Sequence, residues 1–183
     1  MNCRFDNSEY TGSIIFSGDM YLVQYDDTRL DFQYSEHFNG YVQVPKGIKS
    51  CGYMFNGCYD FNQPILIPSG VIECYNMFQN CTSLSYPITF PKTTTDIRYA
   101  LQGCINVPDV YILNDDLAKK VVIGLVKGHE NASKDITIHC RNINVINGTA
   151  SSESVTGTYI AWNENWYSAE YKIQLTTDMN GVI

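Results

Sequence analysis

Apolar residues recur along the middle of the chain at a fixed interval of 23 residues. Cys58, Cys81 and Cys104 follow this interval, and the same step separates several other sets of positions. With so many positions in phase, the pattern indicates an internal repeat. The other sets are Cys51, Cys74 and Ile97; Phe55, Phe78 and Leu101; and Pro45, Pro68 and Pro91.

Each repeat begins with apolar residues spaced i, i+4, i+7, a spacing that places side chains on one face of an α-helix. A short apolar run between two prolines follows, as in residues 64–68 and 87–91, and its alternating pattern predicts a strand. The repeat therefore predicts a short helix followed by a short strand. The expected inward-facing helix residues are Cys51, Phe55, Cys58, Cys74, Phe78, Cys81, Ile97, Leu101 and Cys104.

A helix and a strand repeated with this period are typical of leucine-rich-repeat solenoids. A degenerate copy of the repeat begins at Phe32, so about four units are expected. The predicted fold class is an α/β solenoid with capped ends. Residues 1–31 form the N-terminal β cap, residues 32–114 the solenoid, and residues 115–183 a C-terminal helix plus strands that serve as a cap or docking subdomain.

The flanking segments carry their own signals. A hairpin is expected around Ser17–Asp19, and a helix capped by residues 114–116 is expected to run to about Lys127. Ile136, Ile138 and Cys140 alternate as a strand that could join the ladder. Two further strands are predicted at residues 158–162 and 171–175, on either side of residues 163–167.

The chain contains seven cysteines, five of which fall on the repeating apolar positions. A zinc site is typically built from closely spaced pairs, and this sequence has no such pair. Two cysteines seven residues apart on one helix face would lie too far apart for a disulfide. Cysteines of a stacked core are the favoured interpretation, and a bridge between adjacent units stays geometrically conceivable. We expect no metal and no other cofactor.

Charge and hydropathy narrow the classes of partner. The net charge is −7 and no cluster of basic residues occurs, so nucleic acid is not an expected partner. No apolar run approaches the roughly 20 residues of a membrane span, so no membrane insertion is expected. The N-terminal residues lack the apolar region of a signal peptide, which predicts a soluble chain that is not exported by that route.

Catalytic patterns are not apparent in the sequence. His139 and Cys140 are adjacent on a predicted strand, so their side chains point to opposite faces and do not form a catalytic pair. None of the common phosphate-binding, metalloprotease or serine-hydrolase motifs is present. We therefore expect no catalytic residues and a protein that is not an enzyme.

Aromatic residues supply the candidate binding surface, because Trp and Tyr are favoured at protein interfaces and stack on sugars. One group comprises Trp162, Trp166, Tyr167 and Tyr171, for which packing of the C-terminal cap, a protein interface and glycan contact all remain open. Outward residues of the repeats form a second group, consisting of Tyr53, Tyr59, Tyr75 and Tyr86, with Asn62 and Gln79 beside them.

Two stretches give the repeat a family resemblance. Residues 54–64, MFNGCYDFNQP, and residues 77–84, MFQNCTSL, resemble the BspA-type leucine-rich repeat of bacterial surface antigens and phage structural proteins. The resemblance covers residues 45–114 well and residues 28–44 loosely. It implies a solenoid with a binding or structural role and without catalytic residues.

The same resemblance implies a biological setting. It favours a decoration, fibre or host-contact component of a bacteriophage particle, located in the virion and present in many copies or as an oligomer. Its partners would be neighbouring virion proteins or a protein or glycan of the host surface. The alternative is an adhesion or interaction module at the bacterial cell surface.

Overall fold

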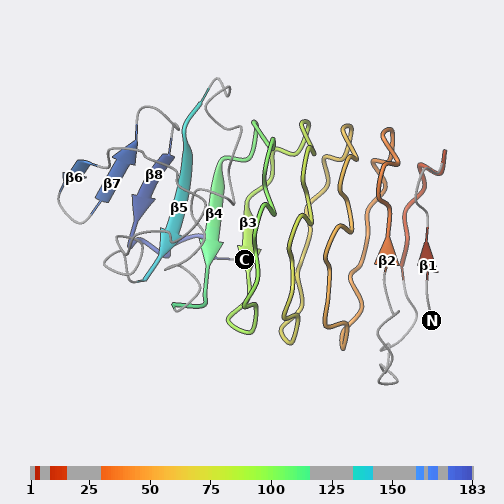
Figure 1. The fold of residues 1–183 in the computed structure, drawn as a ribbon, viewed down its shortest axis with the longest axis horizontal. Coiled ribbons are helices and arrows are strands. Elements are labelled where there is room, and N and C mark those ends of the chain that lie inside the picture. Colours follow the sequence, from red (N-terminus) through yellow and green to blue (C-terminus); the bar gives the residue numbers. More distant parts are fainter. Residues whose placement is uncertain are drawn as a thin grey trace.

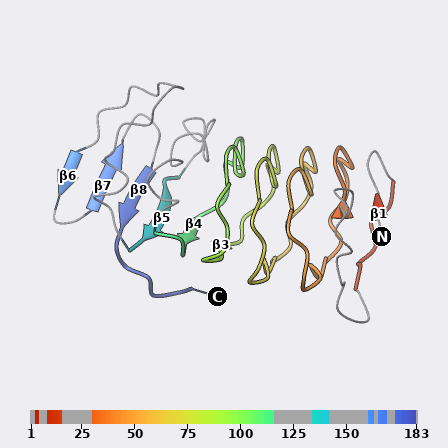
Figure 2. The ribbon, with the colours of Figure 1, turned by 60° about the horizontal axis from the view of Figure 1, so that its bottom comes forward.

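The computed structural model describes residues 3–4, 9–15, 30–115, 134–141, 160–162, 165–168 and 173–182. The chain winds as a row of coils lying side by side, with the N-terminus at one end of the row (Figures 1 and 2). The C-terminal residues turn back from the other end and run toward the middle of the row, beside β3 (Ile88–Phe90).

Regular strands are short and are concentrated in the second half of the chain. Near the N-terminus, β1 (Cys3–Arg4) pairs in parallel with β2 (Leu30–Asp31). The remaining strands form one six-stranded sheet in the order β3-β4-β5-β8-β7-β6. Its first four strands are parallel and its last two pairings are antiparallel. These strands are β3, β4 (Asp109–Ile112), β5 (Ile136–Cys140), β6 (Ile160–Trp162), β7 (Asn165–Ser168) and β8 (Ile173–Thr176).

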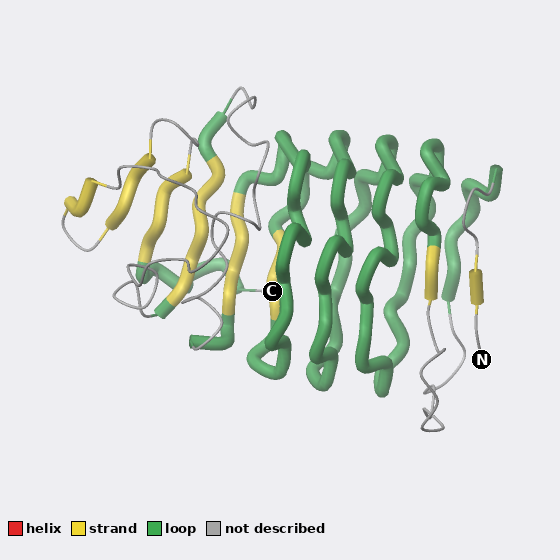
Figure 3. The backbone as a smooth tube through the Cα atoms, viewed as in Figure 1, coloured by secondary structure: helices red, strands yellow, loops and turns green. Residues whose placement is uncertain are grey.

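The prediction of an α/β solenoid is wrong. The described residues contain no helix, and Figure 3 shows only strands and loops. The positions expected to be helical form successive tight turns, interrupted by residues with positive φ. Tyr53 and Gly57 have φ angles of 61° and 76°, and Asn76 and Asn80, one period later, have 54° and 64°. A right-handed helix cannot continue through such residues.

These turns satisfy the backbone in two alternating ways. The N–H groups of Cys51, Tyr53, Phe55 and Gly57 donate to carbonyls of the next coil, at distances of 2.8–3.0 Å. The N–H groups of Met54, Asn56 and Cys58 donate back to the carbonyl three residues earlier within the same coil, at 3.0–3.2 Å. The next coil repeats this arrangement from Cys74 onward. The 23-residue period therefore appears as hydrogen bonds between coils.

Stacked phenylalanine rings fill the space inside the coils. The ring centroids of Phe32 and Phe55 lie 5.4 Å apart, those of Phe55 and Phe78 lie 5.5 Å apart, and the two rings of each pair are nearly parallel, with 4° between their planes. A second column, Phe38 and Phe61, lies beside the first, with 4.3 Å between Phe55 and Phe61. Such offset stacks add to the free energy gained from burying the rings.

The spacing between paired residues of the ladder departs from 23 residues between β3 and β4. Ile88 of β3 pairs with Val110 of β4, which is 22 positions later and not 23. The stretch from Cys104 to Val110 of β4 is therefore one residue shorter than the equivalent stretch from Cys81 to Ile88 of β3. As a result, Tyr111 and not Ile112 lies opposite Thr89 in the ladder.

The flanking predictions have different outcomes. The strand predicted at Ile136–Cys140 is confirmed and joins β4 in parallel. The two-strand prediction for the C-terminal part is incomplete, because residues 165–168 form a strand of their own, β7. The predicted hairpin at residues 17–19 and the predicted helix at residues 116–127 lie outside the described residues.

Candidate functional site

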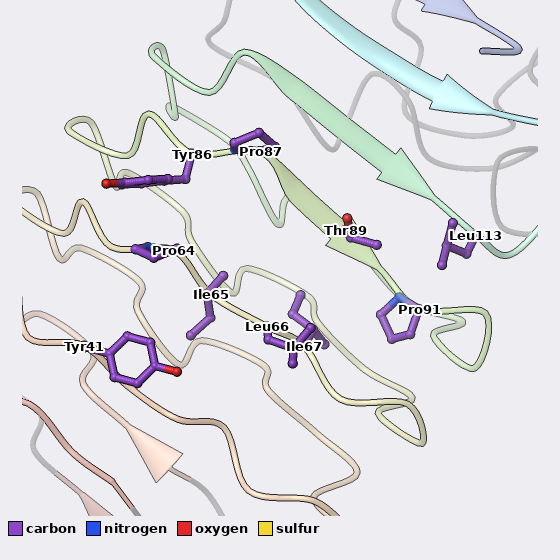
Figure 4. Close-up of a pocket in the computed structure, with 10 residues that line it drawn as sticks. All are labelled: Tyr41, Pro64, Ile65, Leu66, Ile67, Tyr86, Pro87, Thr89, Pro91 and Leu113. Atoms are coloured by element: carbon purple, nitrogen blue, oxygen red, sulfur yellow. The ribbon is translucent and has the colours of Figure 1, made fainter. Parts of the chain in front are cut away.

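An apolar groove opens on the face of the coils that carries the strands (Figure 4). Its volume is about 280 Å³. Residues from neighbouring coils contribute to it, so the groove exists only when the coils stack. The lining residues are Tyr41, Pro64, Ile65, Leu66, Ile67, Tyr86, Pro87, Thr89, Pro91 and Leu113.

Prolines explain why the ladder is open here. The expected strand at residues 64–68 forms no strand, and within the described residues no backbone hydrogen bond joins Ile65–Ile67 to β3. Proline has no N–H and cannot donate to a ladder. Pro64 and Pro68 flank the segment Ile65–Ile67, and Pro87 and Pro91 flank β3. The two segments therefore stay apart, and the groove lies between them (Figure 4).

Leu66 contributes an exposed apolar side chain to the lining of the groove. The position one period earlier holds Gln43 and the position one period later holds Thr89, so polar residues are the usual choice for this outward site. Leu66 is 66% exposed, while Ile67 beside it is buried in the core. Because Leu66 is exposed beside other apolar lining residues, it is a candidate for contact with another molecule.

Thr89 leaves a polar group in the groove without a partner. Its hydroxyl oxygen is buried and makes no hydrogen bond to any described residue. An unpaired buried hydroxyl destabilises a protein by about 1–3 kcal/mol. In a native structure such a group is explained by an ordered water, by an ion or by a group of a bound partner.

The groove is electrically neutral. None of its ten lining residues is an acidic or basic residue. Its polar groups are hydroxyls of two tyrosines and one threonine, together with backbone groups. Such a lining has no charge with which to hold a metal ion, a phosphate or a nucleic acid backbone.

The same face of the sheet is covered farther along by the C-terminal tail, residues 177–182. Tyr111 of β4 donates its hydroxyl to the Asn180 carbonyl at 3.1 Å. His139 of β5 contacts the Asp178 carbonyl through Nδ1 and the Asp109 carboxylate through Nε2, the latter at 2.9 Å. Each ring nitrogen of His139 therefore lies against one oxygen atom, the one of the tail and the other of β4.

The tail fixes the positions of these side chains. The Tyr111 and His139 rings stack with centroids 4.2 Å apart, and His139 is only 7% exposed. Gly181 has a φ of 103°, and a Cβ on it would lie 2.5 Å from the Tyr111 hydroxyl oxygen. Glycine is therefore required for the tail to lie this close to the sheet.

The repeat cysteines lie in the core together with the apolar residues of the stripe. Cys51, Cys58, Cys74, Cys81 and Cys104 are each at most 1% exposed, and all are free thiols. The thiols of Cys58, Cys81 and Cys104 donate to the carbonyls of Phe32, Phe55 and Phe78, respectively, at 2.8–3.1 Å. Burial raises the pKa of Cys58 and of Cys104 to about 12, so both remain protonated and unreactive.

The aromatic residues proposed as a binding surface do not form one patch. Tyr86 lines the groove, while Tyr59 is 41% exposed outside it. Tyr53 and Tyr75 are half-buried and contact each other edge-to-face at 5.2 Å. Trp162, Trp166 and Tyr167 lie on β6 and β7, which three strands separate from β3, and Tyr171 lies outside the described residues.

Polar side chains of the repeats hold the coils together. The Asn62 N–H donates to the Asn39 side chain at 2.8 Å, and the Ser85 N–H donates to the Asn62 side chain at 3.0 Å. The Gln79 side-chain amide donates to the Gln102 side-chain carbonyl at 3.0 Å. Asn62 and Gln79, expected on a binding face, therefore take part in the contacts between coils.

Most of the groove was not predicted from the sequence, although one signal was present. The run at residues 64–68 reads Pro-Ile-Leu-Ile-Pro, with an apolar residue at the position where a half-buried strand alternates to a polar one. That break in alternation marks Leu66. The contributions of Tyr41, Thr89 and Leu113 depend on how the coils stack and are not visible in the sequence.

In the described part of the chain, no cluster of three or more His, Cys, Asp or Glu side chains could hold a metal ion. On the exposed surface, His37 Nδ1 lies 2.8 Å from Asp60 Oδ2, and this hydrogen bond raises the pKa of His37. Among the described residues, no helix is long and apolar enough to cross a membrane.

Comparison with known proteins yields no relative. No protein-family model matches the sequence, and neither a curated protein nor a solved structure matches the chain significantly.

Proposed function

We propose that this chain is a non-enzymatic structural or binding protein that makes its contacts through a surface built by the repeats. The observation that carries the proposal is the groove, which neighbouring coils line with uncharged residues and which places Leu66 66% exposed to solvent. Exposed apolar surface on a rigid frame suits contact with another macromolecule. The lining contains no acidic or basic residue, no histidine and no cysteine.

The setting we propose is a bacteriophage particle, in which the chain would be a decoration, fibre or host-contact component. This part rests on the resemblance of residues 54–64 and 77–84 to BspA-type repeats. In a particle the chain would be present in many copies, so weak contacts at each groove would add up to strong attachment. The alternative, an adhesion or interaction module at the bacterial cell surface, rests on the same repeats.

Fractionation of the producing culture tests the proposal. Peptides of this chain would be quantified by mass spectrometry in nuclease-treated particles, in the cell envelope and in the cytosol. Enrichment in particles together with known particle proteins is the expected result. Enrichment in the envelope would favour the adhesion module, and recovery from the cytosol alone would contradict both.

A further inference from the structure

We propose that the groove binds an extended, uncharged polypeptide segment of a partner protein, which lies across the strands and carries apolar side chains. The proposal rests on the proposed function and names the kind of partner that the groove accepts. The chain's own C-terminal tail provides the structural precedent, because it already lies across the same face of the sheet.

The tail defines how a segment binds this face. The Asp178 carbonyl pairs with His139 on β5, and the Asn180 carbonyl pairs with Tyr111 on the adjacent strand β4. Tyr111 and His139 are direct partners in the ladder. The tail turns at residues 180–181, and the Asn180 N–H donates to the Asp178 carboxylate at 2.8 Å. The tail thus presents one carbonyl to each strand that it crosses, with a step of two residues per strand.

Thr89 is the next position in this row. It lies on β3 directly opposite Tyr111, so Thr89, Tyr111 and His139 occupy successive strands on one face. His139 and Tyr111 each contact a carbonyl of the tail. The Thr89 hydroxyl, in contrast, is buried and has no partner among the described residues. The groove therefore offers a third, vacant donor of the kind that the tail already uses.

The groove and the tail site are physically continuous. Leu113 lies two residues beyond Tyr111, so both point to the same side of the strand line, and Leu113 lines the groove. The tail runs from β8 past β5 and β4 toward β3 (Figures 1 and 2). A partner segment in the groove would thus extend the line of the tail toward the N-terminal coils.

The lining selects the side chains of the segment. Leu66, Ile65 and Leu113 offer apolar contacts, and Pro64 and Pro87 add rigid apolar edges. Burying a charge against such a wall without a counter-charge is strongly unfavourable. A glycan needs several polar partners for its hydroxyls, and the groove has few. An uncharged apolar peptide fits this chemistry best.

Selection from a displayed library of short random peptides, with the full chain as target, tests the inference. We expect enriched peptides to be uncharged and rich in apolar residues. Their affinity should fall at least about tenfold for Leu66→Glu and about fivefold for Thr89→Val, the loss typical of one hydrogen bond. Ile15→Glu, which alters a 70% exposed aliphatic side chain outside the groove, is the matched control and should leave affinity unchanged.

Methyl chemical-shift mapping on the wild-type chain provides a second measurement that needs no variant. Addition of an enriched peptide should shift the methyl signals of Leu66, Thr89 and Leu113 while those of buried core residues remain in place. If a variant loses its native melting transition, its loss of affinity is not informative. The chemical-shift mapping of the wild-type chain then tests whether the peptide binds in the groove.

Several outcomes would overturn the inference. These are the absence of enriched peptides, enrichment of charged peptides, and peptides that bind Leu66→Glu and wild type equally. Self-association that Leu66→Glu abolishes would make a second copy of this chain the occupant. A glycan that shifts the same methyl signals would replace the peptide. If the chain is found in particles but binds no peptide, the proposed function stands and the peptide-binding groove is rejected. If the chain binds peptide but is found only in the cytosol, the peptide-binding groove stands and the proposed function is rejected.

Discussion

One outward position on each coil decides the character of the strand-bearing face. It is occupied by Gln43, Leu66, Thr89 and Tyr111 in successive coils. Gln43 faces solvent, Leu66 forms an apolar floor, Thr89 holds a vacant hydroxyl, and Tyr111 bonds to the tail. Thr89 and Tyr111 lie on the paired strands β3 and β4, whereas Gln43 and Leu66 lie outside any strand.

Thr89→Val should stabilise the protein even though it removes a polar group. Valine has nearly the same shape and eliminates the buried, unpaired hydroxyl, so the free energy of unfolding should rise by roughly 1 kcal/mol. Urea denaturation measures the change, with Thr89→Ser as a control that keeps the hydroxyl and loses a methyl group. A loss of stability for Thr89→Val would show that the hydroxyl is satisfied in the free protein.

The core thiols should be inert in the native state. Burial raises the pKa of Cys58 and Cys104 to about 12, and it raises the pKa of Cys81 as well. At pH 8 their alkylation by iodoacetamide should be roughly a hundredfold slower, or more, in the folded protein than in urea, because reaction requires opening of the core. Peptide mass spectrometry reads each cysteine separately. Fast native labelling of Cys81 would contradict the stacked core.

The same pKa shifts set a pH dependence. A thiol whose pKa is raised in the folded state stays protonated there, while the unfolded chain loses the proton above its ordinary value of 9.0. The stability that these thiols contribute is therefore complete below pH 9 and declines as the pH rises toward about 12.

At the scale of elements, residues with left-handed backbone conformation replace the expected helix. Tyr34, Gly57, Asn80 and Gly103 share one position of the repeat and all have positive φ. The i, i+4, i+7 spacing is real, but a series of tight turns places the same residues inward as a helix would. The sequence therefore identified the buried residues correctly and the element type wrongly.

Position 80 offers a matched test of this backbone. Asn80 has a φ of 64°, which glycine adopts freely and alanine does not. Asn80→Ala should be less stable than Asn80→Gly by about 1 kcal/mol. Thermal denaturation of both variants measures the difference. Equal stability, or a more stable alanine variant, would contradict the left-handed conformation and would be compatible with a helix at this position.

At the scale of the whole molecule, the period governs how coils stack. Hydrogen bonds and ring stacks join each coil chiefly to its immediate neighbours. Proteins of this kind behave as one-dimensional arrays, whose stability is approximately the sum of the units and their interfaces. Deletion of a whole repeat unit should therefore leave a protein that folds cooperatively, whereas deletion of part of a unit should not.

Deletion of residues 59–81 removes one full period and joins Cys58 to Thr82, which normally follows the equivalent Cys81. This variant should still melt cooperatively, with a melting temperature lowered by roughly 5–10 °C, because it loses one interface. Deletion of residues 59–80, one residue shorter, shifts the inward positions and should abolish the cooperative transition. Calorimetry compares the two, and equal behaviour would argue against register as the determinant of stacking.

The sequence by itself determined the period, the identity of the core residues and the strand at Ile136–Cys140. Each of these depends on which side chains avoid water, and that preference is written in the order of apolar and polar residues. The tertiary structure alone decided that turns replace helices, that the step shortens by one before β4, and that the tail covers Tyr111 and His139. It also created the groove, because Tyr41, Leu66, Thr89 and Leu113 come together only when coils distant in sequence stack around prolines that keep the ladder open.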